Sequence, residues 1–284
     1  YLIPAFIGLI VLTYVPLVAV FGLSFFKWGG TGLPEWVGLG NYVKLFTSDP
    51  YFTESVKVTV YFSLLAVIGS MIYSLVIALL LNRNIPARGF FRAVFYLPYV
   101  LPATAVYIGW SWLYNTEWGL FNFILGKLGI ERLMFVSSSS QVVPSLALIA
   151  VWLSGNLIVI FLAGLQNVPR VYHEAAQIDG ANSWQRFWHV TIPSMTPIIF
   201  YNMLMALITN MQVVTPALAL TKGGPGKSSY FISYMLYNYA FKQRGKLGLA
   251  CAIAFVLFLL IGVFTLILFA TSKSWIFYEG GENK

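Results

Sequence analysis

Long apolar runs separated by short polar segments make up most of the chain. A run of about 20 apolar residues is long enough for an α-helix to cross the hydrocarbon core of a bilayer. Runs of this length lie at about 2–25, 58–81, 93–114, 142–165, 195–218 and 247–270. They do not alternate between polar and apolar residues, as the strands of a membrane barrel do. The pattern therefore predicts an all-α polytopic membrane protein, with residues 1–284 forming one transmembrane domain of six spans.

The composition agrees with a bilayer as the solvent. Of the 284 residues, 59% are hydrophobic and only 9% are charged, whereas soluble domains carry roughly 25% charged residues. The net charge is +8. Because basic residues flank membrane spans and meet lipid headgroups, we expect membrane lipid and not nucleic acid as the partner of these charges. The first residue is Tyr, not Met, so we expect a preceding segment in the natural chain.

Basic residues do not settle the orientation of the spans. Six spans place both termini on one side, together with the second and fourth loops. That side carries seven Lys and Arg residues and the other side ten, so a plain count would put the termini outside. The loop at 82–92, however, holds three arginines in eleven residues, which argues the reverse.

The predicted spans contain no Asp, Glu, Lys, Arg or His. Ionisable residues within a membrane mark proton relays, ion paths and sites for charged ligands. Their absence disfavours a proton-coupled carrier or an ion pump and fits a path for a neutral, hydrogen-bonding solute. The alternative is that a partner subunit supplies the charge.

A polar segment at 166–194 interrupts the apolar pattern between the fourth and fifth runs. Pro169 suits the start of a helix, where its missing N–H costs nothing, and Gly180 can adopt the left-handed conformation that ends one. Ser183 can cap a second helix that runs toward the membrane. Helical spacing gives the first helix an apolar stripe of Val171, Ala175 and Ile178. Such a helix either docks on a partner or lies in the membrane interface.

Three motifs in the chain together suggest a family. Glu174-Ala175-Ala176 followed by Asp179-Gly180-Ala181 resembles the EAA loop of ABC importer permeases. The segment 221–225, Thr-Lys-Gly-Gly-Pro, resembles the Thr-x-Gly-Gly-Pro motif of the maltose-type carbohydrate branch of that family. The segment 96–102, Tyr-Leu-Pro-Tyr-Val-Leu-Pro, also looks like that branch. The resemblance extends from about Asn41 to Phe269.

The resemblance implies a type I (MetI-like) permease subunit of an ATP-driven carbohydrate importer, multi-pass in the cell membrane with both termini cytoplasmic. Its EAA loop, at about 169–190, would dock as a coupling helix on a separate ATPase. The implied partners are a second permease subunit in a heterodimer, two ATPase subunits, an extracytoplasmic solute-binding protein and an oligosaccharide. ATP and Mg²⁺ would bind the ATPase subunits, and this chain would hold no cofactor. The coupling residues would be Tyr172, Glu174, Ala175, Ala176, Asp179, Gly180 and Ala181.

Two motifs suggest chemistry that the rest of the sequence does not support. Gly226-Lys227-Ser228 resembles the end of a phosphate-binding loop, but Thr221 stands where that loop needs a glycine, and no strand is expected before it. His173 and His189 have no acidic or cysteine cluster beside them, so we expect no metal site. No set of residues suited to catalysis is present, and we do not expect an enzyme.

A sugar path needs aromatic surfaces and neutral hydrogen-bonding groups within the membrane. Trp152 and Asn156 are four residues apart and would share one helical face, as would Asn202 and Thr209. Asn210 falls where maltose-type permeases place a sugar-contacting asparagine, counted back from the Gly-Gly-Pro motif. The alternative is that these side chains hold helices together. The candidates for the path are Trp152, Asn156, Asn202, Thr209, Asn210 and Gln212.

Other features concern helix shape and packing. The residues Pro98, Pro102, Pro197 and Pro216 can each bend a span, and the small residues Gly248 and Ala252 predict that the last span packs closely against another helix. Two rival functions stay open: a stand-alone secondary carrier, and an ABC permease for a non-sugar solute such as glycerol phosphate. The second rival would want a basic residue on the path.

Overall fold

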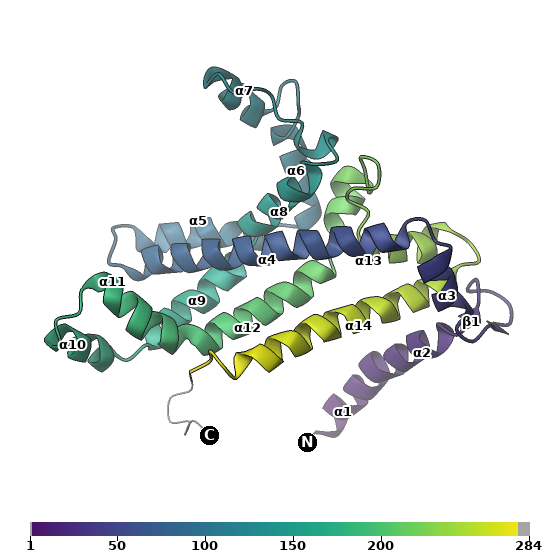
Figure 1. Ribbon diagram of the computed structural model, residues 1–284, viewed down its shortest axis with the longest axis horizontal. Helices are drawn as coiled ribbons and strands as arrows, with labels where there is room; N and C mark the ends of the chain where they lie inside the picture. The colour runs from purple at the N-terminus through teal and green to yellow at the C-terminus, as the bar shows by residue number, and fades with distance from the viewer. Residues whose placement is uncertain (1, 278–284) are drawn as a thin grey trace. The chain divides into compact units, whose positions relative to one another are not determined.

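The computed structural model describes residues 2–277 and is mostly helical (Figure 1). Four helical stretches are long and apolar enough to cross a membrane: Ile3–Leu23, Phe52–Asn82, Ser183–Met211 and Leu247–Ser272. Two bent helix pairs qualify when each pair is taken as one span, which gives up to six spans in the described part of the chain. The prediction of an all-α membrane protein is confirmed.

The α-helices are α1 (Ile3–Leu9), α2 (Val15–Leu23), α3 (Gly40–Thr47), α4 (Phe52–Asn82), α5 (Arg88–Val100), α6 (Ala103–Leu113), α7 (Leu120–Lys127), α8 (Val142–Trp152), α9 (Gly155–Asn167), α10 (Arg170–Ile178), α11 (Ser183–Arg186), α12 (Ile192–Met211), α13 (Ile232–Tyr237) and α14 (Leu247–Ser272). Turns of π-helix lie at Ile10–Tyr14, Phe187–Thr191, Ala217–Thr221 and Asn238–Lys242, and a 3-10 turn at Phe135–Ser137. Two short strands, β1 (Phe26–Lys27) and β2 (Glu35–Trp36), pair antiparallel.

The third apolar run is not one straight span, which corrects the sequence prediction. Helices α5 and α6 meet at an angle of 100°. The break falls at Leu101, whose backbone is extended (ψ 145°). Leu101 precedes Pro102, and a residue before proline is pushed out of the helical region. Pro98, by contrast, lies inside α5 without ending it.

The fourth and fifth runs also differ from the prediction. Helices α8 and α9 are bent by 48° at Leu153–Ser154. The Ser154 hydroxyl bonds to the Val151 carbonyl (2.7 Å) and lies 2.9 Å from the Ser74 hydroxyl, which holds the bend against α4. The fifth run starts earlier, at Ser183, and its continuous helix ends at Met211, before the predicted end at Leu218.

The described residues divide into two compact units. The first consists of residues 2–61, 136–143 and 212–263. Its packing depends on close backbone contacts: the Gly248 N–H donates to the Trp28 carbonyl (3.0 Å), and a side chain at Gly248 would overlap the Phe26 carbonyl. The small residue at 248 thus allows close packing, but the neighbour is this connecting segment and not the helix that the sequence predicts.

The second unit consists of residues 62–135, 144–211 and 264–277. Helices α4, α9 and α12 supply its apolar core, and Gly164 of α9 lies against Met195 of α12, where a Cβ atom would come 3.1 Å from the Met195 sulfur. In Figure 1, α10 and α11 lie together beyond the ends of α9 and α12, and α7 lies at the other end of this unit. The core residues are Ala78, Leu81, Ile158, Phe161, Leu162, Leu165 and Met195.

Candidate functional site

The helix α10 has well-defined ends. Pro169 is its N-cap, with an extended backbone, and the helix begins at Arg170. At the other end, the Ala181 N–H donates to the Ala176 carbonyl (2.8 Å) and the Gly180 N–H to the Gln177 carbonyl (3.0 Å). This pair of bonds is the Schellman motif, which needs a left-handed residue after the cap. Gly180 has φ +79°, so the predicted glycine stop is confirmed.

The surface of α10 is uncovered in this chain. None of its residues is buried, and Ile178 is 87% exposed. Glu174 and Ala175 are also exposed, and Ala176 is half-buried. The predicted apolar stripe of Val171, Ala175 and Ile178 therefore faces no cover within the described residues. A short helix of this kind is marginal alone, so a surface that covers the stripe would stabilise it.

The segment after α10 connects the helix directly to a span. Asn182, and not Ser183 as predicted, is the N-cap of α11: its side chain accepts from the Gln185 N–H (2.9 Å), and the Gln185 side chain accepts from the Asn182 N–H (2.8 Å). This reciprocal pair is a capping box. The helix then continues through Phe187–Thr191 into α12 without a break. Displacement of α10 would therefore act on α12 through one short turn.

The predicted pair Trp152 and Asn156 does not lie on one helix. Trp152 is the last residue of α8, and Asn156 is the second residue of α9, beyond the bend. The four-residue spacing therefore does not place them on a common helical face, which corrects that prediction. The Trp152 ring lies edge-on to Trp110, with centroids 5.6 Å apart, and Asn156 is half-buried.

The polar residues of α12 lie in different surroundings. Asn202 is fully buried, and its amide donates to the Leu157 carbonyl of α9 at 3.3 Å. Its carbonyl oxygen is buried without a hydrogen-bond partner among residues 2–277. Thr209 is exposed, and Asn210 is half-buried with its amide bonded to the Ala206 carbonyl (2.8 Å). Gln212 is exposed just beyond α12 and belongs to the other unit.

The Gly226-Lys227-Ser228 segment does not form a phosphate-binding loop. A π-helical turn precedes it, at Ala217–Thr221, and not a strand. The Lys227 ammonium lies over the rings of Tyr230 (4.5 Å) and Tyr51 (5.0 Å). Ser229 closes the preceding turn by donating to the Gly224 carbonyl (2.6 Å). The lysine is thus held by aromatic rings in a structural turn.

Other lysines in this part of the chain also lie over tyrosine rings. Lys242 lies 5.6 Å from the Tyr237 ring centre, and Lys246 lies 4.8 Å from that of Tyr239. The Tyr239 hydroxyl bonds to the Asp49 carboxylate. Burial, reinforced by this carboxylate, raises the pKa of Tyr239. The phenol therefore stays protonated as a hydrogen-bond donor at physiological pH.

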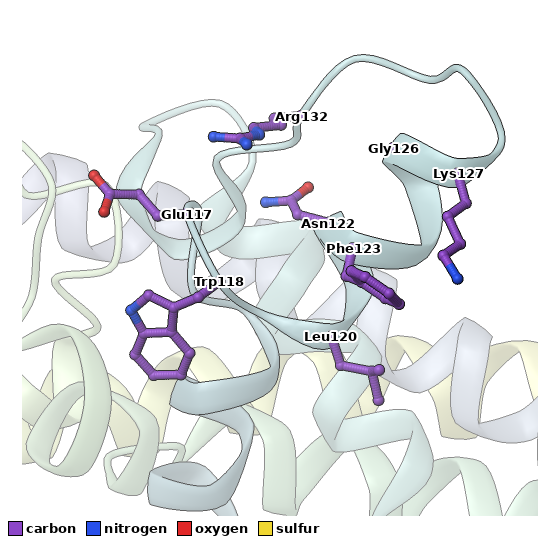
Figure 2. A pocket seen from close by; sticks show the side chains of 8 residues that line it. All are labelled: Glu117, Trp118, Leu120, Asn122, Phe123, Gly126, Lys127 and Arg132. Atoms are coloured by element: carbon purple, nitrogen blue, oxygen red, sulfur yellow. The ribbon is translucent and has the colours of Figure 1, made fainter.

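Sequence reasoning missed two pockets of the second unit. One, of about 620 Å³, lies beside α7: Glu117 and Trp118 lie on one side of it, Arg132 on the loop above, and Lys127 next to Phe123 at the far end of α7 (Figure 2). Buried Asn122 closes the loop beside it, with bonds to the Thr116 and Leu133 backbone. The other pocket is basic and lies at the opposite end of the unit, and its only sequence signal was the density of arginines at 82–92.

Comparison with known proteins identifies the family. Residues 70–274 match the family described as binding-protein-dependent transport system inner membrane component. The probable ABC transporter permease protein YesP of Bacillus subtilis is 37% identical over 99% of this chain and 91% of its own length. The multiple sugar-binding transport system permease protein MsmF of Streptococcus mutans is 33% identical over 94% of this chain and 91% of its own length.

Two further comparisons extend the match. The trehalose/maltose transport system permease protein MalF of Thermococcus litoralis is 31% identical over 94% of this chain and 90% of its own length. The fold is similar to that of a chain in the crystal structure of a bacterial ABC transporter involved in the import of the acidic polysaccharide alginate. That structure has a TM-score of 0.81 and 21% identity, over 96% of this chain and 93% of the other. The chain therefore belongs to the binding-protein-dependent transport system inner membrane components, the permease subunits of ABC importers, and is part of a transport pore and not an enzyme.

Proposed function

We propose that the chain is one half of a heterodimeric pore that imports a neutral oligosaccharide, driven by two separate ATPase subunits. The observation that carries this proposal is the exposed helix α10, whose apolar stripe has no cover within the described residues. A groove on an ATPase subunit would cover it. ATP and Mg²⁺ would bind those subunits. This chain would contribute the segment Tyr172–Ala181, which we call the lever, and would not itself hydrolyse ATP.

The lever works through Tyr172–Ala181. When ATP binding closes the ATPase subunits, α10 moves with them, because Glu174, Ala175 and Ala176 lie in the docked helix. The Asp179–Gly180–Ala181 turn fixes the direction of the following chain, and the capping box starts α11 directly after it. Since α11 continues into α12 without a break, the motion reaches the span that carries Asn202, Thr209 and Asn210. The pore then turns from inward-facing to outward-facing.

The solute class is supported by the names of two relatives, which concern multiple sugars and trehalose or maltose. The absence of charged residues from the predicted apolar runs fits a neutral solute. On α12, Thr209 and Asn210 are accessible to a solute, whereas Asn202 is buried against α9. We therefore assign the solute contacts first to Asn210 and Thr209, with Trp152, Asn156 and Gln212 as further candidates.

The position of the lever fixes the orientation of the spans in the membrane. With α10 in the cytosol, both termini are cytoplasmic and the loop that carries α7 faces outward, where a solute-binding protein would deliver the sugar. The basic fifth loop also faces outward. Three of its lysines lie over tyrosine rings of the same loop. Packing within the loop therefore accounts for these lysines as well as the orientation of the spans does.

A variant in the apolar stripe tests the proposal. Ile178→Glu places a charge on an exposed position of α10, where this chain itself loses no packing. We expect the variant to insert normally but to lose most of the copurifying ATPase subunit and of the ATP-driven sugar uptake in vesicles. Leu33→Glu is the matched control, because Leu33 is also apolar and 96% exposed but lies outside the lever. Full retention of ATPase and uptake by Ile178→Glu would overturn the assignment.

A further inference from the structure

A basic pocket of about 820 Å³ lies in the second unit, where α4 and α9 end and α5 and α10 begin. Its lining includes the four arginines Arg83, Arg88, Arg92 and Arg170, and the His173 side chain lies beside them. Arg88 and Arg92 are four residues apart on α5 and so occupy one face of that helix. Segments that are separate in the sequence thus bring their cations to one place.

The positive charge of this pocket is not balanced by the chain. No Asp or Glu lines it, and within residues 2–277 none of its arginines is ion-paired. Arg88 uses its Nε to bond the Leu81 carbonyl (2.6 Å), which closes the end of α4. The Nε of Arg92 is buried and has no hydrogen-bond partner among the described residues. A buried donor of this kind is costly unless a ligand satisfies it.

An apolar groove of about 250 Å³ joins this pocket. The two share Arg92 and Gln166 in their linings. Away from these residues, the groove is walled by Leu81 of α4, Tyr96 of α5, and Ile158 and Leu162 of α9. The cationic pocket therefore continues into an apolar groove along the same helices. A soluble anion or an acidic protein surface would use only the first part of this arrangement.

We propose that the pocket and groove together bind an anionic phospholipid, with the phosphate among the four arginines and one acyl chain in the groove. Basic pockets between membrane helices on the cytoplasmic side are suited to such headgroups. We place this lipid in the cytoplasmic leaflet. That placement rests on the proposed function, because it takes α10 as cytosolic. The lipid site itself does not depend on which solute is imported.

The test uses the purified complex of this chain with its partner subunits. The complex is incubated with equal amounts of phosphatidylglycerol and phosphatidylcholine that carry the same acyl chains, and retained lipid is counted by native mass spectrometry. We expect phosphatidylglycerol to be retained selectively. Each of Arg92→Gln and Arg170→Gln should lower its retention about fivefold. The matched control is Arg132→Gln, in the pocket of Figure 2, which should change nothing.

A second pair of variants tests the groove. Val159 lines the groove and is about half exposed, so Val159→Trp fills the channel without touching the arginines. It should reduce phosphatidylglycerol retention, whereas Leu148→Trp, at a similarly exposed position on α8, should not. Lipid retention is read without any uptake assay, so its failure and a failure of sugar transport are separate results.

Three results would overturn the proposal. Equal retention by Arg92→Gln, Arg170→Gln and Arg132→Gln would exclude a role for the pocket. Displacement of phosphatidylglycerol by millimolar inorganic phosphate, with Val159→Trp without effect, would indicate a site for free phosphate. Loss of the ATPase subunit from the arginine variants with lipid retention unchanged would indicate a protein interface.

Discussion

Within the proposed lever, Gly180 is the residue whose backbone conformation should matter most. Its φ of +79° is disfavoured for other residues, although nothing lies within 4 Å of the position that a Cβ atom would take there. We expect Gly180→Asp to strain the turn by about 1–2 kcal/mol and to leave insertion intact. Uptake per ATP hydrolysed should fall by about tenfold, which corresponds to roughly 1.4 kcal/mol of lost coupling. The measurement compares ATP hydrolysis and sugar uptake in the same vesicles.

Gly129→Asp is the control for that variant. Gly129 also has a left-handed backbone (φ +71°) with open space around it, but it follows α7 at the other end of the unit. It should keep hydrolysis and uptake coupled. If both variants uncouple equally, the effect comes from general strain and not from the lever.

Asn202 and Asn210 should respond differently to substitution. Asn202→Leu removes one bond between α12 and α9, and such bonds are worth about 0.6 kcal/mol on average. It also removes a buried, unpartnered oxygen, so the thermal midpoint and the sugar KM should change little. Asn210→Ala removes only a bond within α12 and should raise the KM about fivefold if one solute hydrogen bond of roughly 1 kcal/mol is lost. The reverse order would place the solute path at Asn202.

At the scale of elements, helix α14 packs closely against the Phe26–Trp28 segment. Adding a single Cβ atom at Gly248 tests this contact. A Cβ at Gly248 would overlap the Phe26 carbonyl and lie 3.2 Å from the Trp28 nitrogen. Gly248→Ala should therefore destabilise the first unit by about 1–3 kcal/mol, as overpacking does. Gly262→Ala, in the same helix with open space around it, should be neutral. Thermal midpoints of the two purified variants in one detergent decide the matter.

The apolar pattern predicted which elements exist but not where they bend. Run length and composition were enough to locate the membrane helices, because lipid leaves the backbone no other partners. The sequence marked four prolines as possible bends, but it did not distinguish between them. The structure shows that the third run breaks before Pro102, whereas Pro98 stays within α5. The bend at Ser154 involves Ser74, a residue 80 positions away. A local pattern cannot contain such a contact.

The ends of α10 and α11 were easier to predict than the surroundings of the polar residues chosen for the solute path. Glycine stops and caps depend on near neighbours, so Gly180 was found, and only the choice between Asn182 and Ser183 as the cap was wrong. The path residues were chosen by helical spacing, which fails once a helix breaks between Trp152 and Asn156. Spacing also places Asn202 and Thr209 on one face, although one is buried and the other exposed.

At the scale of the whole molecule, a count of charges said little because it ignores where they gather. Arginines from 83 to 170 converge on one pocket. Lysines of the fifth loop lie over tyrosine rings, where ring quadrupoles attract them. The positive-inside rule treats these two groups as equivalent. The three-dimensional arrangement separates cations that are open to an anionic ligand from cations already held by the protein.

The chain alone should transport nothing. It is a permease subunit and so part of a pore, the proposed lever needs a separate ATPase, and the predicted spans contain no Asp, Glu, Lys, Arg or His that could couple uptake to an ion gradient. We therefore expect vesicles that hold only this chain to show no sugar uptake, with or without a proton or sodium gradient. Vesicles with the second permease, the ATPase subunits, the binding protein and ATP should accumulate sugar. Gradient-driven uptake by the lone chain would favour a secondary carrier. Competition by glycerol phosphate in the complete system would shift the cargo to an anion, and a basic residue would then have to line the path.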